Sequence, residues 1–119
     1  IIRENIEYGK KYGAADTAIP STDTIVTSKD NVIISDIPDR KKMYQGQTPQ
    51  TFRAKRLREL YYSLTEEEKE ILTDASKIYI MKGEKVYLVN GEVSNIKITY
   101  PYDLRVAETL VNNMEGEGL

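Results

Sequence analysis

Two residue types that often carry out chemistry in proteins are absent from this chain, because its 119 residues contain no histidine and no cysteine. Histidine is the commonest general base and metal ligand, and cysteine is required for disulfides, thiolate catalysis and Cys-based zinc sites. A hydrolase triad is therefore close to excluded.

The composition restricts the possible partners. Charged residues make up 30% of the chain and hydrophobic residues 39%, which is typical of a globular protein. The formal charge of −2 argues against general affinity for nucleic acid, which depends on neutralising phosphates. The longest apolar runs, such as residues 78–81, are too short to span a bilayer. We therefore expect a cytoplasmic protein with neither a nucleic-acid nor a membrane partner.

The most unusual polar segment is residues 44–52, which read Tyr-Gln-Gly-Gln-Thr-Pro-Gln-Thr-Phe. Gln and Thr beside Pro add little burial and leave polar groups that need partners. Such a composition is typical of a loop that leads into a helix, or alternatively of a polar wall in a binding site. Three further polar segments, residues 23–25, 73–76 and 95–99, surround it in the sequence.

The hydrophobic pattern predicts an α/β domain whose elements must position these segments. Helices are expected over residues 1–12 and 53–64, after a capping box at Thr65 and Glu68, after Thr73-Asp74, and from Pro101 onward with its apolar side chains inward. Strands are expected over residues 14–19 and 86–89, and alternation around Lys97 indicates another over residues 95–99. The tail, residues 115–119, is expected to fray.

Two β-branched runs, residues 22–26 and 32–37, are separated by a turn-rich spacer and bracketed by Pro20 and Pro38. This pattern predicts a β-hairpin that projects from the main sheet as an arm. An exposed hairpin is a liability unless another surface covers it, so we expect the arm to contact a second subunit.

Taken in order, the four polar segments resemble the C-terminal half of the IspD-like sugar-phosphate cytidylyltransferases. That family includes the methylerythritol-phosphate enzyme of isoprenoid synthesis and the ribitol-5-phosphate enzyme of teichoic-acid and capsule synthesis. The resemblance implies that residues 1–119 are the C-terminal half of one Rossmann-like, GT-A-like nucleotidyltransferase domain, with residues 20–45 as a dimer-forming β-arm. Residues 43–47, the short segment 73–76 and the absence of tryptophan look like the ribitol-5-phosphate branch.

The resemblance also implies an activity. The enzyme would transfer CMP from CTP to a polyol phosphate, releasing pyrophosphate, with Mg²⁺ in the intact enzyme and a homodimer as its assembly. Ribitol 5-phosphate is the expected acceptor and 2-C-methyl-D-erythritol 4-phosphate the alternative. Neither G-x-G-x-x-G nor a Walker motif occurs in this sequence. Because the family carries its Gly-rich nucleotide loop in the N-terminal half, we expect the 119 residues alone to be inactive.

Four residues match substrate-holding positions of the family: Thr24, Arg40, Thr73 and Lys97. Thr48, in the Thr-Pro-Gln motif, is a fifth candidate as a wall of the pocket. The resemblance implies that Arg40, assisted by Thr24, reaches the substrate phosphate in the neighbouring subunit. Lys97 would act with Arg40 in catalysis, while Thr73 and Thr48 would line the pocket. Each match also has a purely structural explanation. Arg40 belongs to a solvated run of charges, and Thr24 is an ordinary strand residue. Lys97 would be an edge-strand lysine that discourages aggregation, and Thr73 would cap a helix. A non-catalytic module that only dimerises is therefore the alternative function for the chain.

Overall fold

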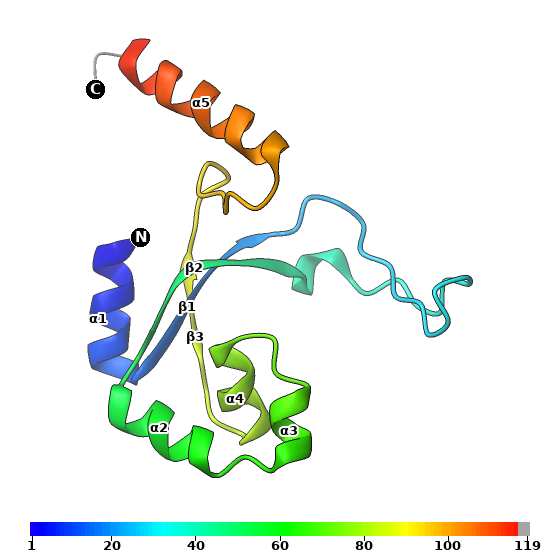
Figure 1. Cartoon of the computed structure of the whole chain (residues 1–119), viewed down its shortest axis with the longest axis vertical. Helices are drawn as coiled ribbons and strands as arrows, with labels where there is room; N and C mark the ends of the chain where they lie inside the picture. The colour runs from blue at the N-terminus through cyan, green and yellow to red at the C-terminus, as the bar shows by residue number, and fades with distance from the viewer. Residues whose placement is uncertain (117–119) are drawn as a thin grey trace.

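The computed structural model of the chain describes residues 1–116 and centres on a three-stranded mixed sheet in the order β2-β1-β3 (Figure 1). The central strand β1 (Ala14–Pro20) runs antiparallel to β2 (Tyr44–Phe52) and parallel to β3 (Tyr87–Asn90). The parallel pairing brings the carboxyl ends of β1 and β3 to the same edge of the sheet. This arrangement confirms the predicted α/β class.

The first helix, α1 (Ile2–Tyr12), lies against one face of the sheet through buried polar contacts and through Tyr12, whose ring stacks on that of Tyr87 in β3. Asn5 donates from Nδ2 to Thr17 Oγ1 on β1 at 2.8 Å and accepts from Thr51 Oγ1 on β2 at 3.2 Å. A Cβ atom at Gly9 would lie 2.7 Å from the Thr51 methyl group, so only glycine allows this close approach. A small set of buried hydrogen bonds therefore fixes α1 to both strands.

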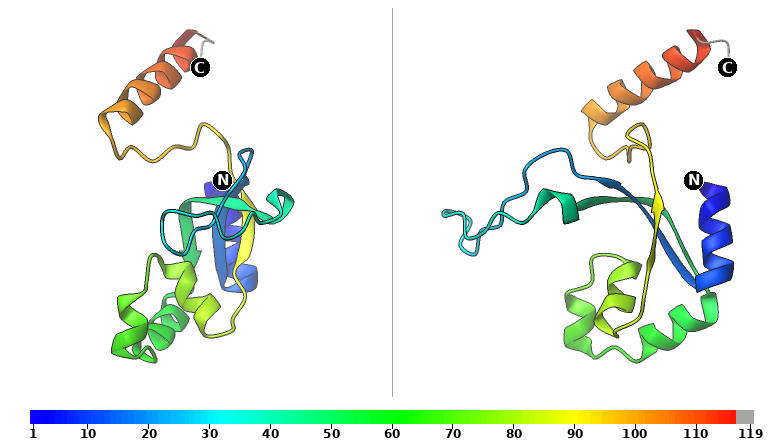
Figure 2. Two further views of the ribbon diagram at one scale, coloured as in Figure 1. Left: turned by 90° about the vertical axis from the view of Figure 1, so that its right-hand side faces the viewer. Right: turned by 180° about the vertical axis from the view of Figure 1, so that it is seen from behind.

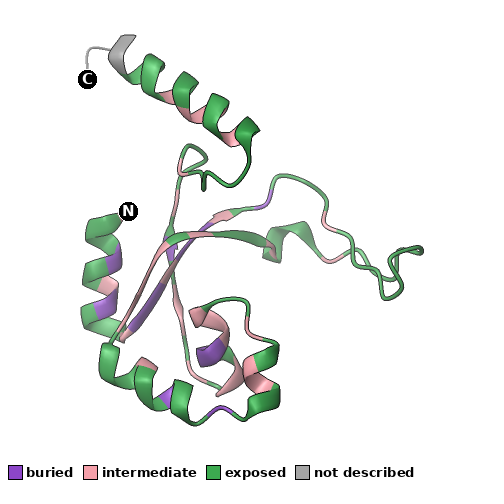
Figure 3. Ribbon diagram, in the orientation of Figure 1, coloured by how far each residue is buried: buried purple, intermediate pink, exposed green. Residues whose placement is uncertain are grey.

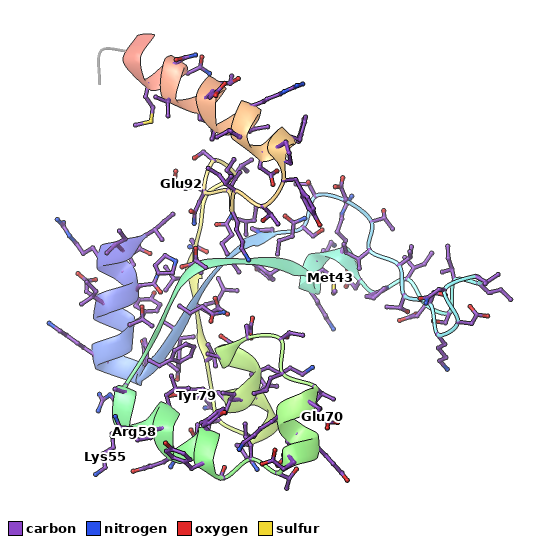
Figure 4. All side chains as sticks on the ribbon, viewed as in Figure 1. Met43, Lys55, Arg58, Glu70, Tyr79 and Glu92 are labelled. Carbon is purple, nitrogen blue, oxygen red and sulfur yellow. The ribbon has the colours of Figure 1, made fainter. Side chains whose placement is uncertain are left out.

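Three helices follow β2 and pack on the opposite face: α2 (Ala54–Tyr62), α3 (Glu66–Glu70) and α4 (Ala75–Met81) (Figure 1). Tyr79 points into the space between the sheet and these helices (Figure 4). Burial is concentrated along β1 and at the contacts of the helices with the sheet (Figure 3). The apolar cluster on this face consists of Ala14, Leu60, Leu64, Ile78 and Tyr79.

The predicted helix ends are largely confirmed. Gly13 adopts a left-handed φ of 89° and ends α1. Thr65 and Glu68 form the expected capping box at the start of α3. At α4 the cap is Asp74, whose side chain accepts from the backbone N–H of Lys77, and not Thr73.

The polar segment of residues 44–52 forms strand β2, so the prediction of a loop from its composition is wrong. Its position in the sheet gives the reason. Strand β2 pairs only with β1, and an edge strand tolerates Pro49, which has no N–H to donate. The pairing also shifts register between Asp16 and Ala18, which leaves β2 less regular than a central strand.

The arm projects from the sheet as expected, but it is not a β-hairpin (Figures 1 and 2). Within residues 21–43 a single bridge, between Thr27 and Asp36, joins its two sides. Val32 and Ile33 are 84% and 68% exposed, so the β-branched side chains have no surface to pack against. A two-stranded ribbon without such a surface is marginal, which explains why the predicted strands do not form. The short 3₁₀ helix η1 (Arg40–Lys42) leads from the arm into β2.

The region after β3 also differs from the prediction. Residues 95–99 form no strand. The final helix α5 (Pro101–Gly116) begins where expected, but it stands apart from the sheet, and Leu104, Val111 and Met114 are each more than half exposed (Figure 2). The predicted inward packing of its apolar side chains is therefore wrong. The tail beyond Gly116 lies outside the described residues. Within residues 1–116 no helix has the length and apolar character needed to cross a membrane.

Candidate functional site

A cleft of about 570 Å³ opens at the edge of the sheet where β1 and β3 end. Its walls come from β2, from the turn before α4 and from residues 93–97, which follow β3. Open α/β sheets bind ligands outside the carboxyl ends of their strands. The position of this cleft is therefore the one that the topology favours for a binding site.

The cleft brings together three of the five residues that the sequence singled out. Thr48 from β2, Thr73 from the turn before α4 and Lys97 from the segment after β3 all line it. Thr24 and Arg40, which belong to the arm and its base, do not line this cleft. One chain therefore carries the predicted set in two separate places.

Lys97 supplies positive charge to the cleft. Its side chain is exposed, and among residues 1–114, whose side chains the structure describes, no carboxylate lies within ion-pair distance of its ammonium group. An ammonium group of this kind is a flexible point charge with three donors, suited to a phosphate. Lys97 reaches the cleft from an irregular segment and not from the strand that its alternating neighbours predicted.

Amide side chains fasten this irregular segment to β2. Asn95 donates from Nδ2 to the Thr48 carbonyl at 2.7 Å and to Gln47 Oε1 at 3.3 Å. Gln47 in turn donates from Nε2 to the carbonyl of Glu92 at 2.8 Å, just beyond the end of β3 (Figure 4). These hydrogen bonds hold the wall that carries Thr48 at a fixed position relative to the segment that carries Lys97.

A second polar group joins the cleft to the interior of the sheet. Asp16, on β1, accepts at Oδ2 from Ser76 Oγ at 2.6 Å and from Gln50 Nε2 at 3.1 Å. The same Gln50 nitrogen donates to Asp74 Oδ2 at 3.3 Å. Gln50 and Asp74 line the cleft, and Asp16 lies behind them. The other carboxylate oxygen, Asp16 Oδ1, is buried and has no hydrogen-bond partner among the described residues.

The environment of Asp16 disfavours its charge. Burial raises the pKa of the Asp16 carboxyl above its ordinary value, and the charge of Asp74 acts in the same direction. The hydrogen bonds from Ser76 and Gln50 favour the ionised form and oppose this rise in pKa without cancelling it. The sequence analysis missed Asp16 and Gln50 as site residues. The available signal was a single acidic residue inside a short strand of mostly small and apolar residues.

The two predicted residues of the arm, Arg40 and Thr24, are exposed to solvent. Arg40 donates from Nη1 to the carbonyl of Thr22 at 3.3 Å, and Thr24 is exposed. Asp39 begins η1 by accepting from the backbone N–H of Lys41 at 3.0 Å, which fixes the backbone at Arg40. The Arg40 guanidinium group forms no ion pair within residues 1–114.

The Mg²⁺ implied by the family resemblance would require a set of oxygen ligands. Among the side chains that the structure describes, those of residues 1–114, no group of three or more His, Cys, Asp or Glu gathers in a way that could hold a metal ion. At the cleft, Asp16 and Asp74 each already accept a hydrogen bond from the amide of Gln50 at one carboxylate oxygen. These residues do not fit a magnesium site by themselves.

A larger cavity, of about 770 Å³, lies at the opposite end of β1 and β3. None of the five predicted residues lines it. Two of its cations are already engaged: Arg56 pairs with Glu84, and Arg53 donates to the carbonyl of Lys10. Stacked Tyr12 and Tyr87 rings form another part of its wall. We therefore place the candidate site in the smaller cleft.

Comparison with known proteins gives a consistent result. The family model for IspD, 2-C-methyl-D-erythritol 4-phosphate cytidylyltransferase, matches residues 2–113. The fold is similar to that of 4-diphosphocytidyl-2C-methyl-D-erythritol synthase from Anaerococcus prevotii, with a TM-score of 0.80 and 33% sequence identity over 93% of this chain and 51% of that chain.

Two further crystal structures of 2-C-methyl-D-erythritol 4-phosphate cytidylyltransferases are similar. The Thermus thermophilus protein gives a TM-score of 0.76 at 29% identity, covering 93% of this chain and 54% of that chain. The Francisella tularensis protein gives 0.78 at 27% identity, covering 90% and 50%. The chain therefore spans about half the length of the structures it matches.

Proposed function

We propose that this chain, which belongs to the IspD family of cytidylyltransferases, holds a polyol phosphate while CMP is transferred to it from CTP. The observation that supports this proposal most is the convergence of Thr48, Thr73 and Lys97 on one cleft at the carboxyl ends of β1 and β3. These three residues come from separate parts of the sequence, and the family resemblance singles them out. A module that only dimerises would not require a cation and two hydroxyl groups in one cleft.

The chemistry of cytidylyl transfer suits the residues of this chain. A phosphate oxygen of the polyol phosphate attacks the α-phosphorus of CTP, a new P–O bond forms, and the bond to the β-phosphate breaks as pyrophosphate leaves. The attacking oxygen is already anionic, so the absence of histidine and cysteine from the chain is no obstacle. Catalysis consists of aligning two polyanions and offsetting their repulsion with fixed positive charge. Lys97 would supply such charge at the acceptor phosphate.

The acceptor that we favour is 2-C-methyl-D-erythritol 4-phosphate. The family model and the similar crystal structures carry that substrate or its product in their names. Ribitol 5-phosphate is the second candidate because of the short segment at residues 73–76, the sequence of residues 43–47 and the lack of tryptophan. Both acceptors are short polyol phosphates, so the same cleft chemistry serves either.

The arm completes the proposal. We infer that it reaches a second copy of the chain, so that Arg40 and Thr24 contribute to the partner's cleft. The exposed β-branched side chains of the arm and the lack of an ion pair for Arg40 within residues 1–114 support this inference. A guanidinium fork can bind a phosphate with two parallel hydrogen bonds, which a lysine cannot reproduce.

The test is a steady-state assay of the full-length protein with CTP, magnesium and each of the two acceptors. We expect CMP transfer to one acceptor and a loss of roughly 10² in kcat/KM for that acceptor in Lys97→Ala, equivalent to about 2.7 kcal/mol of transition-state stabilisation. The KM for CTP should change little. Lys55→Ala, which removes an exposed lysine from α2, is the matched control and should retain wild-type kinetics (Figure 4). Equal losses in both variants, or no transfer to either acceptor by the wild type, would contradict the proposal.

A further inference from the structure

The side-chain amide of Gln50 has only one favourable orientation. Its Nε2 atom lies 3.1 Å from Asp16 Oδ2 and 3.3 Å from Asp74 Oδ2. An ionised carboxylate only accepts hydrogen bonds, whereas the amide nitrogen offers two donors. The reversed orientation would place the amide oxygen against both carboxylates. The two acidic residues therefore assign the nitrogen and oxygen of this amide by chemistry.

This orientation leaves the amide oxygen of Gln50 available to the cleft. Gln50 is half-buried and lines the cleft, and its Oε1 accepts no hydrogen bond from any residue within 1–114. Gln47, on the same strand, differs because Asn95 and the carbonyl of Glu92 occupy both ends of its amide. Gln50 thus presents an acceptor of fixed orientation, whereas both ends of the Gln47 amide form hydrogen bonds within the chain.

A fixed acceptor selects for a hydrogen-bond donor in the ligand. Phosphate oxygens are acceptors and gain nothing from Gln50, whereas a hydroxyl group of a polyol can donate to it. The same cleft carries the cation of Lys97, which suits the phosphate end of such a molecule. One cleft therefore offers complementary groups for the two chemically different ends of a polyol phosphate.

We propose that Gln50 is a specificity residue that accepts a hydrogen bond from one hydroxyl of the polyol chain, and that Asp16, Asp74 and Ser76 are the residues that position it. This inference rests on the proposed function, because it identifies Gln50 as the residue that recognises a hydroxyl group of the acceptor. Ser76 contributes by donating to Asp16 at 2.6 Å, which holds the carboxylate in place behind Gln50. A site built to bond a hydroxyl discriminates strongly against an analogue that lacks it.

The experiment compares the full-length wild type with Gln50→Met, using CTP with the accepted polyol phosphate and with its single-deoxy analogues. Methionine has a similar length and no amide acceptor. We expect one deoxy analogue to lose about tenfold or more in kcat/KM with the wild type. Gln50→Met should lose a similar factor with the parent substrate and should no longer distinguish the parent from that analogue. The KM for CTP should be the same in both proteins.

Gln47→Met is the matched control because it removes an amide from the same strand whose two ends are used within the chain. Its loss should be the same for the parent and for every analogue. Gln50→Asn, which keeps the amide but withdraws it by one methylene, should reproduce the pattern of Gln50→Met and serves if the latter folds poorly. Uniform losses across the analogues in the Gln50 variants would overturn the role of Gln50 alone. A wild type that transfers CMP to no polyol phosphate would overturn the proposed function and this inference together.

Discussion

Asp16 is a carboxylate that the fold holds in an unfavourable environment. Burial raises its pKa above the ordinary value of 3.8, so the folded chain binds a proton at Asp16 more readily than the unfolded chain does. The resulting contribution to stability is fully present below the unfolded pKa and is lost as the pH rises through the folded pKa. Above the folded pKa the buried charge therefore reduces the stability of the fold, while the carboxylate accepts hydrogen bonds from Gln50 and Ser76.

Replacing Asp16 with asparagine should reveal this cost. Asn keeps the shape of the side chain and does not titrate, so the free energy of unfolding of the variant should gain relative to the wild type as the pH rises from about 4 to about 7. Denaturant unfolding at a series of pH values measures the difference. Parallel curves for the two proteins over this range would show that the pKa of Asp16 is not raised in the folded state.

At the residue scale, the sequence does not predict hydrogen bonds between side chains that lie far apart in the chain. The family resemblance indicates Thr48, Thr73 and Lys97, and the structure places them in one cleft. Gln50 was visible only as one of several glutamines. Its partners Asp16 and Asp74 lie 34 and 24 residues away, and no local pattern indicates that all three meet. The orientation of an amide is a tertiary property, and a sequence motif does not contain it.

At the scale of elements, the turn between α2 and α3 offers a direct test of the local signals. Thr65 accepts from the backbone N–H of Glu68 at 3.1 Å, and Glu68 Oε1 accepts from the backbone N–H of Thr65 at 2.9 Å. Thr65→Ala should lower the free energy of unfolding by about 1 kcal/mol, because one backbone N–H of α3 loses its acceptor. Thr65→Ser, which keeps the hydroxyl group, should lose much less. Chemical denaturation of the wild type and the two variants measures the free energy of unfolding. An equal loss of this free energy in both variants would show that the effect comes from packing and not from the hydrogen bond.

Elements whose ends are set by local chemistry were predicted well, and elements that depend on partners were not. Gly13 ends α1 and the capping box begins α3, as their sequences indicate. Strand β2 was missed because its polar composition suits a strand only at the edge of the sheet beside β1. The β-branched runs of the arm suggested strands, but within residues 21–43 only one bridge forms. The periodicity of a sequence indicates which face of a helix or strand is apolar, but it does not indicate which other element packs against that face.

At the scale of the whole molecule, the predicted site residues fall into two groups on different parts of the chain. The cleft holds Lys97 with Thr48 and Thr73, while Arg40 and Thr24 belong to the arm that projects from the sheet (Figures 1 and 2). If two chains associate so that each arm reaches the cleft of the other, every site contains Lys97 of one subunit and Arg40 of its partner. A closed twofold dimer would then hold two such composite sites.

Subunit mixing tests this composite site most directly. Full-length Arg40→Ala and Lys97→Ala proteins should each be nearly inactive as homodimers, because every site lacks one cation. In a heterodimer, one site combines the intact arm of the Lys97→Ala subunit with the intact cleft of the Arg40→Ala subunit. We predict that mixing the two proteins restores about half of the wild-type activity per heterodimer, because one of two sites is complete. A mixture that stays as inactive as both parents, with heterodimers confirmed by native mass spectrometry, would contradict the shared site.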